Sequence, residues 1–354
     1  MTSRTIAASA PQRGTGLVET LVGLAIGLLT LVAIFQVYAV SESHKRTIAT
    51  GSDAQQSASF ALFLIARDVA NAGNGVASAA VTVDGRTVLD GCALLRSIPI
   101  LIEAGARAVD PDAITVFYGA SSSLATPVAL AANAEVRSLA SADRYVISAP
   151  AAFGPNDVIA AVDGATCTLS TIDPAGVEVS GAGLATLAHT PLSGALGFVY
   201  SAGSAFLVNL GRAARLARLR YSVDTSSRAL RTQHQLPTAG PVNPILGDIV
   251  NLKAQYGLDT DADGTVDTWQ AATGTVWSSA SLPSQPLATI RQIQSVRVAI
   301  VARSPQYERE AVTPGPVLLF DGTIAIALSA DQQHYRYRVV ETIVPLRNTL
   351  WNAT

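Results

Sequence analysis

The chain has 354 residues, of which 49% are apolar and 14% are charged, and its formal net charge is -2. This composition is too apolar for a disordered chain and is sufficient for a sizeable hydrophobic core. The near-balanced charge excludes a globally basic protein that attracts nucleic acid through its overall field.

The N-terminal segment is basic and is followed by a long apolar stretch. Residues 1–14, MTSRTIAASAPQRG, contain two arginines and no acidic residue, and the apolar stretch runs from Leu17 to Val40 without lysine or arginine. A helix of about 24 residues is long enough to cross a bilayer. The stretch is longer than the apolar core of a secretory signal. Because a basic leader stays in the cytoplasm, we expect one membrane span with the C-terminal bulk on the other side.

One acidic residue, Glu19, lies inside this stretch, in the sequence RGTGLVETLVGLAIGLL. A carboxylate within a membrane helix costs about 2.5 kcal/mol or more to insert, so it needs a partner. Cleavage after Gly14 would create a free amine on Thr15, four residues before Glu19, and that amine could provide the positive charge. A plain signal anchor is the alternative, and it leaves Glu19 without a partner.

The leader and the helix together resemble the type III signal of type IV pilins and pseudopilins. The shared features are a basic leader ending in Gly14, an apolar helix, and glutamate as the fifth residue after the cut. The resemblance implies that a prepilin peptidase cuts between Gly14 and Thr15 and that the new N-terminus is methylated. It also implies that Glu19 pairs with the N-terminal amine of a neighbouring subunit during assembly. Thr15 departs from the family, because major pilins usually carry phenylalanine there.

The helix is expected to continue beyond the apolar stretch to about Asn71. Apolar residues keep a loose helical spacing without an intervening proline, which predicts an amphipathic second half, at Ile48, Ala58, Leu62, Ile65 and Val69. Gly73 and Gly75 follow, and glycine is the preferred residue at helix C-termini.

The rest of the chain is expected to be rich in strands. Alternating or apolar segments predict strands within 112–119, 153–169, 216–233, 295–304 and 336–348. These segments, the ARDVANAG segment before them and the acidic segment QYGLDTDADGTVDTW (255–269) resemble the PilW family of minor type IV pilins, in the same order. The resemblance implies an α+β fold, with a long N-terminal helix followed by a β-rich, mainly antiparallel globular head.

Five regions are predicted along the chain. They are a leader at 1–14, the transmembrane half of the helix at 15–40, its amphipathic half at 41–72, a first, loop-rich part of the head at 73–204, and a second, β-sheet part at 205–354.

The acidic loop DTDADGTVD (259–267) has the spacing of a calcium ligand set. Aspartates stand at positions 1, 3, 5 and 9 around a glycine at position 6, as in an EF-hand loop. Position 12 is Gln270 and not glutamate, so the expected affinity for calcium is weak. An acidic hairpin tip held by Asx turns is the alternative. The expected ligands are the carboxylates of Asp259, Asp261, Asp263 and Asp267 and the backbone carbonyl of Thr265.

The two cysteines, Cys92 and Cys167, have no metal-ligand spacing. Both would lie outside the cytoplasm in the expected topology, where disulfides form and persist. The sequence therefore predicts a disulfide between them, with two buried thiols as the alternative.

Catalysis and nucleic-acid binding have no support in the sequence. The four histidines are scattered, and no G-x-S-x-G, P-loop or dinucleotide motif is present, so we expect no enzymatic activity. Aromatic residues do not interleave with the one arginine run, so a solvated strand face is expected there instead of a nucleic-acid site. That run contains Arg212, Arg215, Arg218 and Arg220.

The resemblance implies a structural and assembly role. The protein would be a minor type IV pilin that primes or caps pilus assembly with other minor pilins and a tip adhesin, in adhesion and twitching motility. It would reside in the bacterial inner membrane with a periplasmic head and then enter the pilus. Two alternatives remain: a type II secretion pseudopilin, and a membrane-anchored, calcium-binding adhesin that never polymerises.

Overall fold

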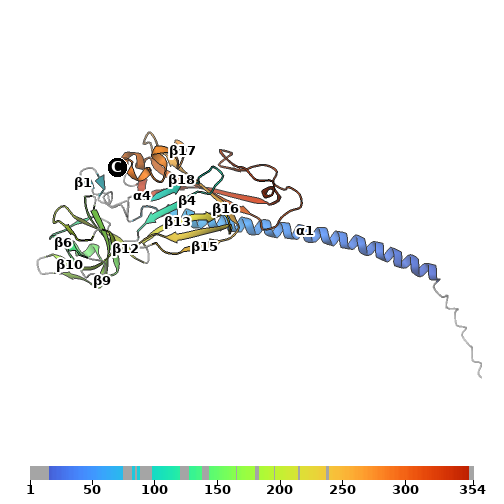
Figure 1. Ribbon diagram of the computed structural model, residues 1–354, viewed down its shortest axis with the longest axis horizontal. Coiled ribbons are helices and arrows are strands. Elements are labelled where there is room, and N and C mark those ends of the chain that lie inside the picture. Colours follow the sequence, from blue (N-terminus) through green and yellow to red (C-terminus); the bar gives the residue numbers. More distant parts are fainter. Residues whose placement is uncertain are drawn as a thin grey trace, which may run out of the picture. The chain divides into compact units, whose positions relative to one another are not determined.

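The computed structural model describes residues 16–74, 82–83, 86–87, 98–119, 127–137, 143–164, 166–179, 183–194, 196–213, 216–236 and 239–350. The chain divides into two units, Met1–Ser52 and Asp53–Thr354. The long helix α1 (Leu17–Ala70) passes from the first unit into the second, and the strands belong to the second, which we call the head (Figure 1).

Helix α1 is continuous over 54 residues and ends where the sequence predicts. Glu19 lies in its first turn and Arg67 in its last, so both charges have the sign that the helix dipole favours. Gly73 follows the helix with a φ of 79°, a conformation that glycine adopts without steric cost.

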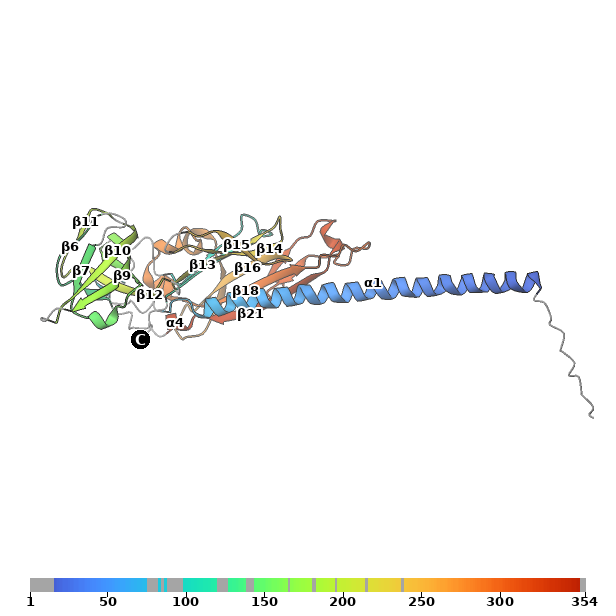
Figure 2. The same cartoon turned by 90° about the horizontal axis from the view of Figure 1, so that it is seen from below.

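The part of α1 that belongs to the head is amphipathic and buries one face. The buried residues recur every three or four positions: Ala54, Ala58, Ala61, Leu62, Ile65 and Val69. They belong to the largest hydrophobic core of the head, together with residues of two antiparallel sheets. Figure 2 shows this end of α1 next to β18 (Ile293–Arg303) and β21 (Tyr337–Pro345).

Polar contacts also tie the C-terminal end of α1 to the head. The hydroxyl of Tyr221 donates to Asp68 Oδ2 at 2.5 Å, and the Gly73 N–H donates to the Phe117 carbonyl at 2.9 Å. Asn348 Nδ2 donates to the Ala72 carbonyl at 3.0 Å.

A five-stranded antiparallel sheet forms one wall of this core. Its strand order is β15-β14-β13-β4-β3, and the β13–β14 hairpin lies at the segment 216–233 where the sequence predicts strands. The strands are β3 (Ile100–Glu103), β4 (Ala113–Tyr118), β13 (Ala217–Asp224), β14 (Ala229–His234) and β15 (Val242–Leu246).

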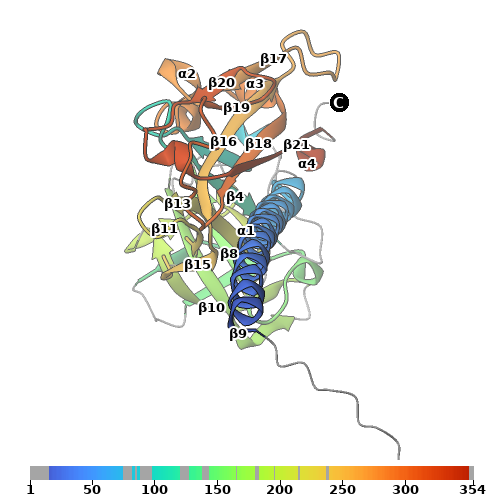
Figure 3. The same cartoon turned by 90° about the vertical axis from the view of Figure 1, so that its right-hand side faces the viewer.

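A four-stranded antiparallel sheet, β17-β16-β18-β21, forms the second wall. Figure 3 shows its two central strands side by side. Residues of β18 alternate between two cores: Val298 and Ile300 pack with α1, while Ala299 and Val301 pack with the hairpin of β19 and β20. The strands are β16 (Ile249–Leu258), β17 (Thr268–Ala271), β18 (Ile293–Arg303), β19 (Val317–Leu319), β20 (Ile324–Ile326) and β21 (Tyr337–Pro345).

A buried ion pair joins these two sheets. Asp112, directly before β4, accepts hydrogen bonds from Lys253 Nζ on β16 at 2.9 Å and from the Gly105 N–H at 2.9 Å. Its other carboxylate oxygen accepts from the Ala254 N–H at 3.1 Å. The side chains of Asp112 and Lys253 are only 7% and 6% exposed.

A six-stranded antiparallel sheet, β5-β12-β8-β9-β10-β7, packs into two further hydrophobic cores, one of which also contains Phe117 of β4. Its strands are β5 (Val128–Ala129), β7 (Asp143–Ile147), β8 (Asp157–Asp163), β9 (Thr166–Val179), β10 (Ala185–Gly194) and β12 (Phe206–Arg212). The short pair β6 (Ala134–Val136) and β11 (Phe198–Tyr200) packs against it. A further pair is formed by β1 (Thr82–Val83) and β2 (Arg86–Thr87).

Short helical turns complete the head. They are η2 (Pro150–Ala152), α2 (Gly274–Trp277), η3 (Leu282–Ser284), α3 (Leu287–Arg291), η4 (Gln332–His334) and α4 (Arg347–Leu350).

The α+β class with a β-rich, mostly antiparallel head is confirmed. The sheets, however, cross the expected division of the head at 204/205. Strand β12, expected in the second part, pairs with β8 of the first, and β4, expected in the first part, pairs with β13 of the second. The region expected to be loop-rich contains most of the six-stranded sheet.

Candidate functional site: the helix start and the acidic loop

The first functional candidate is the start of α1. Residues Leu17–Tyr38 form an apolar helical segment with a mean hydropathy of 2.3, and it is not buried against the rest of the chain. At about 1.5 Å per residue, 22 residues extend about 33 Å, which matches the hydrocarbon thickness of a bilayer. The segment is therefore long and apolar enough to cross a membrane.

Glu19 is exposed within this segment, in the first turn of α1. Its backbone N–H donates to the Gly16 carbonyl at 2.9 Å, so Glu19 is already part of the helix. The free N–H groups of a first turn carry partial positive charge, which favours a carboxylate there. The predicted cleavage residues, Gly14 and Thr15, lie outside the described residues.

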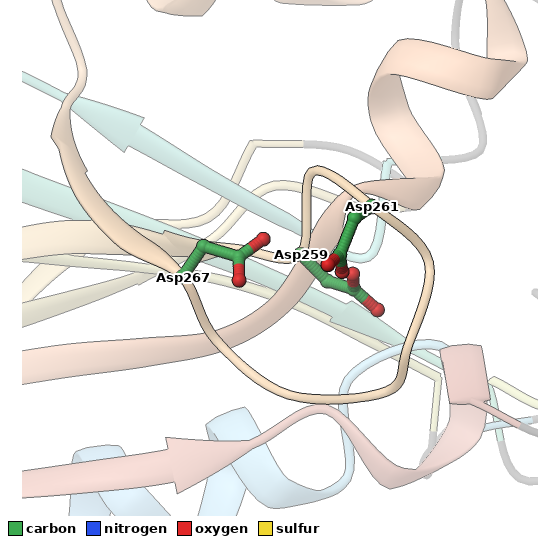
Figure 4. A group of neighbouring side chains, drawn as sticks. All are labelled: Asp259, Asp261 and Asp267. Carbon is green, nitrogen blue, oxygen red and sulfur yellow. The ribbon is translucent and has the colours of Figure 1, made fainter.

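The second candidate is the acidic loop between β16 and β17. Carboxylate oxygens of Asp259, Asp261 and Asp267 all lie within 4.8 Å of one another, and Figure 4 shows the three side chains gathered on one side of the loop. Asp259 is buried, while Asp261 and Asp267 are exposed. Three carboxylates at this spacing form a hard-oxygen group of the kind that calcium prefers.

The loop brings together three of the four predicted carboxylates. Asp263 lies outside this group: its Oδ1 accepts from the N–H and the hydroxyl of Thr265, at 2.7 and 2.6 Å. Gly264, the predicted turn residue, has a φ of 88°, and no other atom lies close to the position of its missing Cβ. A side chain would therefore be disfavoured here by the backbone conformation alone.

The loop also contains Asx turns, which the sequence offers as the alternative to a calcium site. Asp259 Oδ1 accepts from the Ala262 N–H at 2.7 Å, and its Oδ2 accepts from the Gly264 N–H at 2.9 Å. Asp267 Oδ2 accepts from the N–H and the hydroxyl of Thr260, and these donors lower the pKa of Asp267 below its usual value. The loop thus has a hydrogen-bonded shape of its own, and its carboxylates are held in place.

The other predicted site residues do not gather with these two candidates. Cys167 lies on β9 and is only 7% exposed, and Cys92 lies outside the described residues. Of the arginine run, Arg215 lies outside the described residues, and Arg220 forms an ion pair with Glu103 at 2.7 Å.

The sequence contains little indication of two buried polar contacts of the head. The Asp112–Lys253 and Asp68–Tyr221 pairs each join residues more than a hundred positions apart. A lysine within the strongly apolar strand β16 is the one local signal that a buried partner exists.

An apolar N-terminal helix of membrane-spanning length and a β-rich head of mostly antiparallel strands define a pilin-like protein. Residues 220–348 match the family model of Type IV Pilus-assembly protein W, PilW. The predicted resemblance to the PilW family is thereby confirmed, and the protein is related to the type IV pilus.

The chain was also compared with solved structures and with curated proteins. A solved structure of a type IV-like pilin from Thermus thermophilus is similar over 55% of this chain and 85% of its own chain, with 14% sequence identity and a TM-score of 0.25. No curated protein matches the chain.

Proposed function

We propose that this protein is a minor pilin that assembles with other minor pilins to prime or cap a type IV pilus. The observation that carries the proposal is a lone carboxylate, Glu19, in the first turn of an apolar helix of membrane-spanning length. An ionisable residue in such a helix marks a functional site by default, because its insertion is costly. The PilW match over residues 220–348 supports the pilus as the assembly in question.

The proposed mechanism is packing and one charge pair, without catalytic turnover. A prepilin peptidase cuts between Gly14 and Thr15, and the new amine of one subunit pairs with Glu19 of a neighbour. The protein stays in the inner membrane with a periplasmic head until it is extracted into the filament. Its partners are the other minor pilins and a tip adhesin.

Replacing Glu19 by alanine is expected to leave membrane insertion and cleavage intact and to abolish incorporation into filaments. The measurement is the amount of the protein in sheared pili relative to its amount in the membrane fraction. Glu310→Ala, which removes an exposed carboxylate of the head, is the matched control and should be incorporated normally. Normal recovery of Glu19→Ala in sheared pili would refute the proposed role.

The intact mass of the mature protein tests the processing step in the same cells. We expect a chain that begins at Thr15 and carries a methyl group, and a Gly14→Ala variant that keeps its leader. A chain that keeps its leader would instead support the non-polymerising adhesin.

We also propose the Cys92–Cys167 disulfide. The intact mass of the mature protein after alkylation, recorded with and without prior reduction, tests it.

We propose further that the acidic loop binds calcium, on the strength of the three clustered carboxylates. The expected dissociation constant is about 10⁻⁴ to 10⁻³ M, as for weak extracellular sites. Asp261→Asn should weaken binding about tenfold or more in calorimetry of the full chain in detergent, because it removes a charge and keeps an acceptor for the loop. Asp331→Asn, an exposed control outside the loop, should have no effect. Absence of heat at millimolar calcium would eliminate the site.

A further inference from the structure

The head contains a cavity of about 750 Å³ that is separate from the helix start and from the acidic loop. Its walls come from the loop at 107–111, the β13–β14 turn, the adjoining ends of β16, β18 and β21, and the segment around β20. A volume of this size is typical of sites that bind small ligands or short peptide segments. All of these segments belong to the head.

Arginines dominate the charge of this cavity. Arg107, Arg228 and Arg303 line it, and the one acidic lining residue, Asp110, is already ion-paired with Arg107 at 2.7 Å. No ion pair to Arg228 or Arg303 occurs in the part of the chain that the structure describes. The cavity therefore carries excess positive charge that is available to an anionic ligand.

The side chain of Arg303 and the backbone of Arg228 are held in place by the surrounding structure. The guanidinium of Arg303 lies over the ring of Tyr335, 3.9 Å from its centroid, and its buried Nε has no hydrogen-bond partner among the described residues. Arg228 closes the β13–β14 turn with a φ of 53°, and its carbonyl accepts from the Ile249 N–H at 3.0 Å. Because the planar fork of arginine matches a carboxylate, two guanidinium groups in one cavity, without an ion pair among the described residues, favour that anion.

Asn251 adds a buried polar side chain to the wall of the cavity. Asn251 on β16 is 95% buried, since only 5% of it is exposed. Its Nδ2 donates to the Val109 carbonyl at 2.8 Å, while its Oδ1 has no partner among the described residues. An unsatisfied buried acceptor is costly, so a ligand that brings an N–H group next to its carboxylate would relieve that cost.

The remaining lining is largely aliphatic and includes Val250, Val301, Val317, Ile326 and Leu328. Aliphatic surface favours an aliphatic side chain over a sugar or a free inorganic ion. We propose that this cavity binds a peptide segment of a partner protein in which an acidic residue is flanked by aliphatic residues. Its carboxylate would contact Arg303 and Arg228, its backbone N–H would face Asn251, and its aliphatic neighbours would cover the valines.

A fluorescent capped peptide with one aspartate between two leucines is the probe, and its anisotropy is measured with the full chain in detergent. We expect saturable binding that weakens about tenfold or more in Arg303→Gln and in Arg228→Asn, because a charge-assisted hydrogen bond is lost. Asparagine suits the left-handed conformation at position 228, so that variant should fold. Arg338→Gln removes an exposed arginine outside the cavity and should bind the peptide as the unmodified chain does.

Variant peptides separate the contributions to binding. Replacing the aspartate by asparagine should remove most of the affinity, and replacing the leucines by serine should weaken it as well. Inorganic phosphate at equal concentration should compete poorly. Equal binding of the aspartate and asparagine peptides, or unchanged binding by Arg228→Asn, would overturn the proposal. So would phosphate that competes as well as the peptide, since the site would then hold a simple anion. The binding test involves no filaments, so its outcome does not depend on the proposed role in pilus assembly.

Discussion

Replacement of Asp112 by alanine is expected to lower the free energy of unfolding of the head by about 3–5 kcal/mol. The change leaves the Lys253 ammonium buried at 6% exposure without its carboxylate partner. It also leaves the N–H groups of Gly105 and Ala254 without an acceptor. Each of these losses places an unsatisfied polar group in the region where the two sheets meet.

Chemical unfolding of the full chain in detergent measures this effect, and the same loop provides a matched control. Asp110→Ala removes a partly exposed carboxylate that pairs with Arg107, so it should cost far less stability than Asp112→Ala. The double variant Asp112→Leu with Lys253→Met should recover most of the stability, because apolar residues can replace a buried ion pair. Equal unfolding curves for Asp112→Ala and Asp110→Ala would contradict this account.

The second large effect is a pH dependence that arises from His189 on β10. Its side chain is fully buried, its ring stacks on Tyr145 with 3.8 Å between the centroids, and neither ring nitrogen has a hydrogen-bond partner among the described residues. Burial lowers the pKa of His189 to about 4, while Asp143 and Asp173 act weakly in the opposite direction. The folded head therefore holds this histidine in its neutral form at neutral pH.

The sign of the effect follows from proton binding by the two states. An unfolded histidine has a pKa of about 6.5, so between pH 6.5 and 4 the unfolded chain binds more protons than the folded one. The contribution of neutral His189 to the free energy of unfolding should be fully present above about pH 6.5. It should fall by about 3 kcal/mol as the pH drops to 4.

His189→Phe should remove this part of the pH dependence and keep the contact with Tyr145. Unfolding midpoints recorded between pH 4 and pH 8 test it, and His234→Phe, at an exposed position on β14, is the matched control. Because many carboxyl groups also titrate at low pH, the informative quantity is the difference between variant and unmodified chain. Identical slopes for His189→Phe and the unmodified chain would contradict the assignment.

The sequence predicts those elements whose characteristic residue pattern lies within one continuous segment. Helix α1, the β13–β14 hairpin and strands β18 and β21 all lie where periodicity and turn residues indicate. Strand β18 shows why: its five consecutive buried residues, Val298–Ala302, form an apolar, β-branched run within one continuous segment, although its two faces serve different cores. The acidic loop was predicted for the same reason, because its aspartates follow one another within nine residues.

Long-range pairing was not predicted. Strand β8 lies within the predicted segment 153–169, but its five consecutive buried residues, Val158 to Val162, do not show which strands pair with it. Strand β12 joins β8 through pairs such as Val208 with Ala160, and nothing in either segment identifies the other. The same limit applies to the Asp112–Lys253 pair and to the arginine-lined cavity, whose walls come from segments far apart in the chain.

Asp263 shows a second kind of limit. Its position in the loop is that of a ligand, yet its carboxylate binds the N–H and hydroxyl of Thr265 and lies outside the group of three. The spacing along the chain places a residue such as Asp263 in the loop. Which nearby N–H and hydroxyl donors its carboxylate accepts from then decides where the side chain lies.

The attachment of α1 to the head has a mechanical consequence. The hydrogen bonds of Asp68, Ala72 and Gly73 lie at the C-terminal end of the helix, while its buried apolar face extends back toward Ala54. A force along the axis of the segment 54–73 therefore loads the hydrogen bonds and the apolar contacts together, so that they bear it in parallel. A peeling force from the other end would instead break the hydrogen bonds one after another. The attachment of the helix to the head thus does not depend on its last turn alone.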